Sequence, residues 1–273
     1  LKGVVEHTKL AFAPKLSELS QAKVYVKQEN LQNTGSFKLR GAFNKIATLT
    51  QEERKNGVIA SSAGNHAQGV AYSAKHYGIR AVIVMPESTP LLKVMGVKEL
   101  GAEAILHGNN YDEAYAYALE YAQKNNLHFI HPFADDEVIA GQGTIALEMI
   151  EDQNNLTTIV VPIGGGGLIS GIAAAYKQML PSVRIVGVVA QGAPGMYHSF
   201  YKKAIQTTKS VRTIADGIAV RDVNERNFDY ILESVDEIVM VDDEEIANAI
   251  LYLLEKQKLV VEGAGAAVVA ALL

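Results

Sequence analysis

Short apolar runs alternate with amphipathic segments along the whole chain, and this alternation constrains the fold more than any other feature. A short apolar run bounded by turn residues is typical of a buried strand, and a longer amphipathic segment is typical of a helix. Strands are predicted at 24–27, 58–61, 81–85, 104–106, 127–130, 158–162, 184–189 and 237–241. Helices are predicted at 37–49, 65–77, 91–100, 112–124, 138–151, 168–180, 243–256 and 264–272. Strands that alternate with helices indicate an α/β fold with parallel sheets covered by helices.

Glycine-rich turns follow two of the predicted strands. The strand at 58–61 leads into Ser62-Ala63-Gly64-Asn65-His66, and the strand at 158–162 leads into a run of four glycines. Open parallel sheets bind ligands outside the carboxyl ends of their strands. The polar segment 191–221 is interpreted as loops around one short helix. Because no Pro- or Ser-rich linker divides the chain, any second domain is expected to be an insertion.

The composition excludes several classes of partner. The 273 residues carry a net charge of −5 without a block of lysine or arginine, so neither nucleic acid nor an anionic membrane is expected as a partner. No apolar run reaches the length of a membrane span. Cysteine is absent, which excludes disulfides and is compatible with a reducing cytoplasm. The chain begins with Leu1 and ends within an apolar helical pattern, so we expect further residues at both ends.

Lys38 is predicted at the start of a helix, between Phe37 and Leu39. Ser36 is a favourable N-cap residue, and apolar residues continue at helical spacing beyond it. The helix dipole and the apolar neighbours both disfavour the ammonium form and should lower the pKa of Lys38. A lysine with a lowered pKa is what Schiff-base chemistry requires. On the segment 34–41 alone, an exposed surface lysine is the better interpretation.

The glycine run, followed by Leu168 and an alanine-rich helix, predicts a phosphate site. Four successive glycines leave backbone N–H groups free to point at one anion, and the helix N-terminus adds positive potential. A tight turn alone would need only one or two glycines. No lysine follows in the Walker pattern, and the next strand ends without the acidic residue that a dinucleotide's ribose requires. A phosphate monoester is therefore preferred to NAD, and a nicotinamide dehydrogenase is the weaker alternative.

The segment 62–66 is predicted to bind a carboxylate. The Ser62 hydroxyl, the Asn65 amide and free N–H groups at a helix start suit such a ligand. On these residues alone, Asn65 and His66 could equally be a helix cap and a satisfied, partly buried histidine. The segment 135–137 is interpreted as a solvated turn and helix start. A phosphate site, a carboxylate loop and a neutral lysine together suggest pyridoxal phosphate acting on an amino acid.

Six motifs resemble, in the same order, those of the fold-type II pyridoxal phosphate enzymes. The resemblance is strongest to the threonine dehydratases (threonine ammonia-lyases) and their relative serine racemase, and it extends from near Thr8 to the last residue. The motifs are SFKLRGA at 36–42, SAGNHAQG at 62–69, VIAGQGT at 138–144, GGGGL at 164–168, ADG at 215–217 and EGAG at 262–265. The resemblance implies a tryptophan synthase β-like α/β fold, with two parallel-rich three-layer domains and the cofactor between them. It implies a smaller, mobile domain at 51–130 and a larger one formed by 1–50 and 131–273.

The resemblance also implies roles for individual residues. It makes Lys38 the Schiff-base lysine and the catalytic residue, and it makes Phe37 a contact of the cofactor ring. Asn65 matches the residue that bonds the phenolic oxygen of pyridoxal phosphate. The phosphate cup matches Gly164, Gly165, Gly166, Gly167 and Leu168. The substrate-carboxylate loop matches Ser62, Ala63, Gly64, Asn65 and His66.

Three departures from the family pattern carry information. Serine racemase has a second base, a serine, at the position of Ala63, so elimination is expected to prevail over racemisation here. The divalent-cation site of the racemases would require acidic residues where this chain has Val189, Ala193 and Gly195, so no metal is predicted. The turn that contacts the pyridine nitrogen in this family is expected beyond Leu273.

The resemblance implies pyridoxal phosphate-dependent elimination from L-threonine, and from L-serine, to 2-oxobutanoate or pyruvate and ammonia. Lys38 is expected to remove the α-proton. A cytoplasmic homodimer or homotetramer is expected. The alternatives are a serine racemase-like enzyme, a β-replacement synthase of the cysteine or tryptophan synthase type, and a catalytically impaired amino-acid-binding homologue. Threonine and serine differ by one methyl group, which an apolar pocket distinguishes only weakly.

Overall fold

The structure, a computed structural model, describes residues 1–273 and divides into two compact units. Unit 1 comprises Leu1–Glu6 and Leu31–Gln142, and unit 2 comprises His7–Asn30 and Gly143–Leu273. The predicted smaller domain, 51–130, lies wholly in unit 1, which also contains 31–50 and 131–142. That the segment 51–130 moves as one body stays a prediction.

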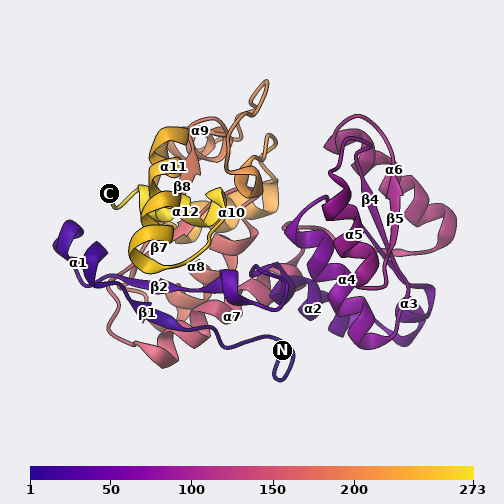
Figure 1. The fold of residues 1–273 in the computed structure, drawn as a ribbon, viewed down its shortest axis with the longest axis horizontal. Helices are drawn as coiled ribbons and strands as arrows, with labels where there is room; N and C mark the ends of the chain where they lie inside the picture. Colours follow the sequence, from indigo (N-terminus) through magenta and orange to yellow (C-terminus); the bar gives the residue numbers. More distant parts are fainter. The chain divides into compact units, whose positions relative to one another are not determined.

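Unit 1 contains a four-stranded parallel sheet in the order β5-β4-β3-β6. Its strands are β3 (Val58–Ser61), β4 (Ala81–Met85), β5 (Glu103–Leu106) and β6 (His128–Phe129). Figure 1 labels two of these strands, β4 and β5. Its helices are α2 (Lys38–Thr48), α3 (Gln51–Asn56), α4 (Asn65–Tyr77), α5 (Leu91–Glu99) and α6 (Tyr111–Asn125). Each crossover between the parallel strands β3, β4 and β5 contains one helix, as the alternation in the sequence predicts.

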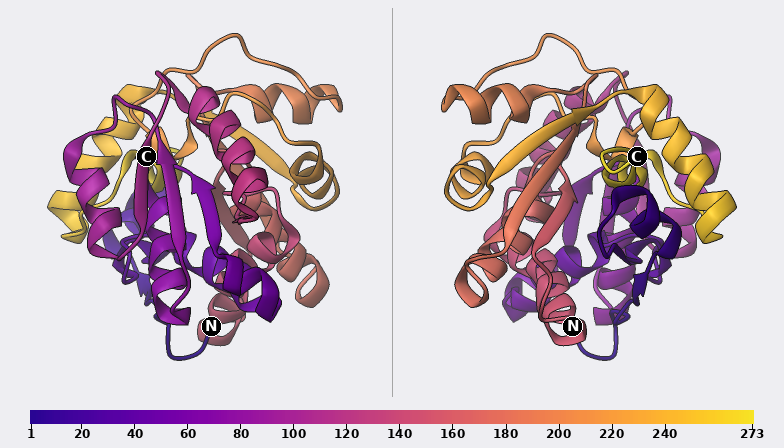
Figure 2. Two further views of the ribbon diagram at one scale, coloured as in Figure 1. Left: turned by 90° about the vertical axis from the view of Figure 1, so that its right-hand side faces the viewer. Right: turned by 90° about the vertical axis from the view of Figure 1, so that its left-hand side faces the viewer.

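Helices cover both faces of this sheet and make a three-layer unit (Figure 2). On β4, Ile83 and Met85 face a core shared with α2, α4 and α5, whereas Val82 and Val84 face a second core shared with α6. Because successive residues of a strand point to opposite faces, a strand buried on both faces is apolar throughout. The continuous apolar sequence 81–85 follows from this arrangement.

A long helix, α7 (Asp136–Asp152), contacts α2 backbone to backbone. A β-carbon on Gly141 would lie 2.6 Å from the Cα of Gly41, and one on Gly41 would lie 2.7 Å from the carbonyl oxygen of Val138. The backbone N–H of Gly41 donates to Oε1 of Gln142 at 3.2 Å. Only glycine permits this approach, which lies three residues after Lys38 along α2.

Unit 2 contains a three-stranded parallel sheet in the order β7-β8-β9 and a separate antiparallel pair. The parallel strands are β7 (Thr158–Pro162), β8 (Arg184–Ala190) and β9 (Glu237–Val241), and the pair is β1 (Leu10–Phe12) with β2 (Tyr25–Lys27). The α-helices are α1 (Pro14–Ser20), α8 (Gly167–Met179), α9 (Gly195–Lys202), α10 (Glu225–Ser234), α11 (Asp243–Tyr252) and α12 (Gly263–Ala270). Short 3₁₀ turns occur at Glu29–Leu31 and Asp216–Ile218, and a π-helical turn at Leu253–Gln257 extends α11. One face of the sheet packs on α11 and α12 in a shared apolar core.

The predicted α/β class with parallel sheets is confirmed, with corrections in detail. The predicted strand 24–27 belongs to the antiparallel pair rather than to a parallel sheet. Its partner β1 and the helices α1, α3 and α10 were not predicted. The segment 191–221 contains one α-helix, α9, as predicted. None of the helices is both long and apolar enough to cross a membrane.

Candidate active site

Lys38 is the first residue of α2, and its side chain is partly buried. The N-cap position belongs to Phe37 and not to Ser36 as predicted, although the Ser36 hydroxyl accepts a hydrogen bond from the Lys38 N–H at 3.4 Å. Nζ of Lys38 donates to the carbonyl oxygen of Pro132 at 2.9 Å and lies 5.4 Å from the centroid of the Phe37 ring. Burial lowers the pKa of Lys38 from 10.5 to about 8. The predicted lowering of this pKa is confirmed, with burial as its cause.

The beginning of α4 lies against the beginning of α2. A β-carbon on Gly69 would lie 3.1 Å from the carbonyl oxygen of Lys38. His66, in the first turn of α4, is buried, and its Nε2 bonds the carbonyl oxygen of Ile130 at 2.9 Å. A carbonyl only accepts, so Nε2 carries the proton. Burial, and then the positive charge of Lys38, lower the pKa of His66 to about 3, so this histidine is neutral.

The end of β3 and the first turn of α4 each contain a polar atom without a hydrogen-bond partner. Nδ1 of His66 and Oγ of Ser61 are buried and have no hydrogen-bond partner. The Ser62 hydroxyl accepts from the N–H of Gly64 at 3.2 Å, and Gly64, without a side chain, holds the N-cap position. The interpretation of Asn65 as the cap is therefore wrong, because Asn65 is the first helical residue. The first-turn amides of a helix have no acceptor within the helix, so this helix start suits an anion.

The glycine run forms a tight turn at the start of α8 in unit 2. Gly166 has φ +91°, in the left-handed region, and a β-carbon there would lie 3.0 Å from Cβ of Asn227. A β-carbon on Gly164 would lie 2.9 Å from Cα of Ile218. Nδ2 of Asn227 donates to the carbonyl oxygen of Gly165 at 2.6 Å and holds the turn. This turn presents the first amides of α8 without side chains in the way, which fits a phosphate group.

The predicted site residues are distributed over both units. Unit 1 contains Phe37 and Lys38 together with Ser62, Ala63, Gly64, Asn65 and His66. Unit 2 contains Gly164, Gly165, Gly166, Gly167 and Leu168. The partly buried amine of unit 1, with its lowered pKa, suits an aldehyde, and the glycine turn of unit 2 suits a phosphate; these are the two groups by which each unit could bind pyridoxal phosphate. No group of three or more histidine, aspartate or glutamate side chains is placed to hold a metal ion.

Sequence reasoning missed two residues beside Lys38. Pro132 accepts the hydrogen bond from the lysine amine, and His131 precedes it. Burial, and then the charge of Lys38, lower the pKa of His131 to about 4. One signal was present in the sequence, since both residues follow β6 at the carboxyl edge of a parallel sheet.

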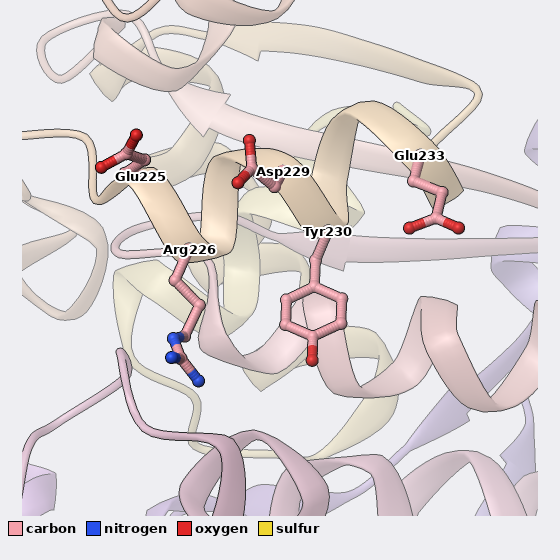
Figure 3. Close-up of a pocket in the computed structure, with 5 residues that line it drawn as sticks. All are labelled: Glu225, Arg226, Asp229, Tyr230 and Glu233. Atoms are coloured by element: carbon pink, nitrogen blue, oxygen red, sulfur yellow. The ribbon is translucent and has the colours of Figure 1, made fainter.

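An open pocket in unit 2 is lined by charged and aromatic side chains. Glu225, Arg226, Asp229, Tyr230 and Glu233, all from α10, line it. In Figure 3, Arg226 and Tyr230 point to one side of α10, and Glu225 and Asp229 point to the other. The lining comes from one helix and includes none of the residues predicted to bind the cofactor or the substrate.

The sequence matches a family of known enzymes over its whole length. The family model described as "Pyridoxal-phosphate dependent enzyme" matches residues 1–273. An L-threonine ammonia-lyase of Thermotoga maritima is 52% identical over 273 residues, which is 100% of this chain and 68% of that protein.

Solved structures give the same picture. The processed form of threonine deaminase isoform 2 from Solanum lycopersicum superimposes with a TM-score of 0.95 at 40% identity, covering 98% of this chain and 74% of that one. Maize serine racemase superimposes with a TM-score of 0.95 at 36% identity, covering 98% of this chain and 82% of that one.

Proposed function

The chain belongs to the family of pyridoxal-phosphate dependent enzymes, and we propose that it is an L-threonine ammonia-lyase that also accepts L-serine. The similarity to an L-threonine ammonia-lyase at 52% identity over all 273 residues supports this proposal. The reaction breaks the bonds from the α-carbon to hydrogen and from the β-carbon to oxygen. The water lost in this elimination is regained when the enamine product is hydrolysed, so threonine yields 2-oxobutanoate and ammonia.

The Lys38 amine, partly buried and held against the Pro132 carbonyl, is the observation that carries the proposal. With a pKa of about 8, about one Lys38 in ten is neutral at pH 7. A solvated lysine with a pKa of 10.5 would be neutral in roughly one molecule in three thousand. Only the neutral amine can attack an aldehyde or take up a proton, so burial supplies the reactive form.

Each part of the site has one task in the proposed reaction. When bound, pyridoxal phosphate supplies an aldehyde for a Schiff base and a ring that accepts the electron pair of the broken carbon–hydrogen bond. Lys38 would hold the aldehyde and, once released by the substrate's amino group, would take the α-proton at Nζ. The first amides of α8 would bind the phosphate. Asn65 and the loop 62–66 would hold the phenolic oxygen and the substrate carboxylate.

Ala63 favours elimination over racemisation. A methyl side chain can neither give nor take a proton, and this residue packs against the apolar core of unit 1. Racemisation requires a proton donor on the face of the substrate opposite to Lys38. With no acid or base at position 63, we expect the β-hydroxyl group to leave before the α-carbon is reprotonated.

The test is an assay for ammonia and 2-oxo acid with L-threonine and L-serine, with and without added pyridoxal phosphate. We expect both products from both substrates, and none from Lys38→Ala. Formation of D-serine from L-serine faster than pyruvate would instead identify a racemase. Binding of pyridoxal phosphate and threonine without release of ammonia would identify a binding protein. Either result would overturn the proposal.

We also propose a homodimer or homotetramer that works in the cytoplasm. The absence of cysteine and of any helix able to cross a membrane is compatible with this location. Size-exclusion chromatography with light scattering would measure the subunit number, and a monomer that retains full activity would contradict the proposal.

A further inference from the structure

The turn between β6 and α7 holds the amine of Lys38. The carbonyl oxygen of Pro132 accepts from Nζ at 2.9 Å. Nδ1 of the preceding residue, His131, accepts from the backbone N–H of Phe133 at 3.2 Å and of Ala134 at 2.8 Å. A ring nitrogen can accept only when it carries no proton, so His131 is neutral and its proton is on Nε2.

Both ends of this turn are fixed by other groups. The N–H of Ile130 donates to the carbonyl oxygen of Ile59 on β3 at 2.8 Å. At the other end, Asp135 forms an ion pair with Lys45 at 2.7 Å, and its Oδ1 accepts from two amides in the first turn of α7. Asp135 is therefore a half-buried anchor, which corrects the expectation of a solvated turn. Between these anchors, the bent backbone is held by the two hydrogen bonds to His131.

We propose that His131 is a positioning residue for Lys38. Its Nδ1 lone pair shapes the turn 131–135, and the turn keeps the Pro132 carbonyl against the amine and water away from it. This inference rests on the proposed role of Lys38. It adds the residue, His131, that fixes the position of the lysine amine and limits its contact with water.

The surroundings of His131 keep it in the accepting form at neutral pH. Lys38 and Asp135 are the charged groups that act on it, and the titratable ring of Tyr115 from α6 lies 6.2 Å from its ring. His66 is the other titratable group near Lys38, and it is neutral as well. Burial lowers the pKa of His131 to about 4, so the two amide hydrogen bonds persist throughout the range in which Lys38 titrates.

Two substitutions of His131 distinguish the effect of the accepting Nδ1 atom from the effect of the volume of the ring. His131→Leu removes the acceptor and keeps much of the volume. His131→Asn places an amide oxygen near the position of Nδ1 and cannot titrate. His107→Leu is the matched control, because His107 is also a histidine of unit 1 whose ring contacts a tyrosine, Tyr117, but it is exposed and distant in sequence from the turn.

The readout is the pKa of Lys38 in the full chain without cofactor. Competitive acylation with acetic anhydride at a series of pH values, with the Lys38 peptide quantified by mass spectrometry, gives this pKa directly. Since burial is what lowers the pKa, an opened turn that admits water should raise it. We expect His131→Leu to raise the pKa by about one unit or more, which lowers the acylation rate of Lys38 about tenfold at pH 7. We expect His131→Asn and His107→Leu to leave the pKa at its wild-type value.

Several outcomes would overturn the inference. One is a folded His131→Leu protein in which Lys38 titrates as in the wild type, and another is a His131→Asn protein in which the pKa of Lys38 rises. If His131→Leu fails to fold, NMR of the ring nitrogens in the wild type decides, since a proton on Nδ1 at neutral pH would exclude the two hydrogen bonds. The proposed function is tested separately by borohydride reduction with pyridoxal phosphate, where trapping on a lysine other than Lys38 would contradict it.

Discussion

Replacing Lys38 with methionine removes a partly buried ammonium group and keeps an unbranched side chain of similar length. At pH 7 most Lys38 side chains are protonated even in the folded protein, because their pKa is about 8. The fall in this pKa from 10.5 to about 8 corresponds to about 3 kcal/mol, at about 1.4 kcal/mol per pKa unit. The folded state is destabilised by this free energy at every pH below about 8.

The sign of the pH dependence follows from proton binding. Between pH 8 and pH 10.5 the unfolded chain binds more protons at Lys38 than the folded chain does, so the stability of the wild type rises with pH in this range. Methionine removes this dependence. It also leaves the Pro132 carbonyl without its donor, which costs about 1 kcal/mol. The cofactor-free Lys38→Met protein should therefore be about 2 kcal/mol more stable than the wild type at pH 7, and inactive.

Urea denaturation followed by circular dichroism measures this difference. The advantage of Lys38→Met should shrink as the pH rises above 8, by up to about 1.4 kcal/mol per pH unit. Lys38→Arg is the matched control, because a guanidinium stays charged and should bring no gain in stability at any pH. A Lys38→Met protein that is no more stable than the wild type at pH 7, or whose advantage does not change with pH, would refute the reasoning.

Three further predictions concern the glycines and the histidines. Gly141→Ala would place its Cβ 2.6 Å from the backbone of α2 and should lower the free energy of unfolding by about 2–3 kcal/mol in urea denaturation; an unchanged midpoint would contradict the close approach. Gly166→Ala, at φ +91° and 3.0 Å from Cβ of Asn227, should weaken the binding of pyridoxal phosphate about tenfold in an absorbance titration, and unaltered affinity would argue against the phosphate role. Between pH 6.5 and about pH 4, His66 and His131 are protonated in the unfolded chain but remain neutral in the folded chain, so the free energy of unfolding should fall by up to about 3 kcal/mol for each unit by which the pH is lowered. A free energy of unfolding that does not change over this pH range would exclude the neutral histidines.

The buried strands were predictable because a strand that is buried on both faces has an apolar sequence. β3 and β4, which are buried at every residue, begin and end at the predicted residues, because strands covered on both faces are largely apolar. The partly exposed strands β7 and β9 also begin and end as predicted. α3 was missed because it buries no residue and so shows no apolar periodicity. The capping box between Thr50 and Glu53 was the signal available for it.

Whether a site residue could be predicted likewise depends on whether its contacts are close or distant in the sequence. Lys38 and the glycine turn are recognisable from motifs, because their chemistry depends on residues adjacent in the chain. His131 and Pro132 were not found, since Pro132 lies 94 residues from Lys38 and their contact exists only once β6 has joined the sheet. The neutral form of His131 likewise depends on burial and on two amides of a turn.

The glycine contact between α2 and α7 has a consequence for how this site can change. Gly41 and Gly141 place two backbones against each other three residues after Lys38, with no side chain between them. Side-chain interfaces shift when one residue becomes larger or smaller, whereas a backbone contact keeps its spacing as long as both glycines remain. Many substitutions in the surrounding apolar core should therefore leave the lysine in place. The chain could acquire a different substrate preference through the loop 62–66 while the position of its reactive amine is inherited unchanged.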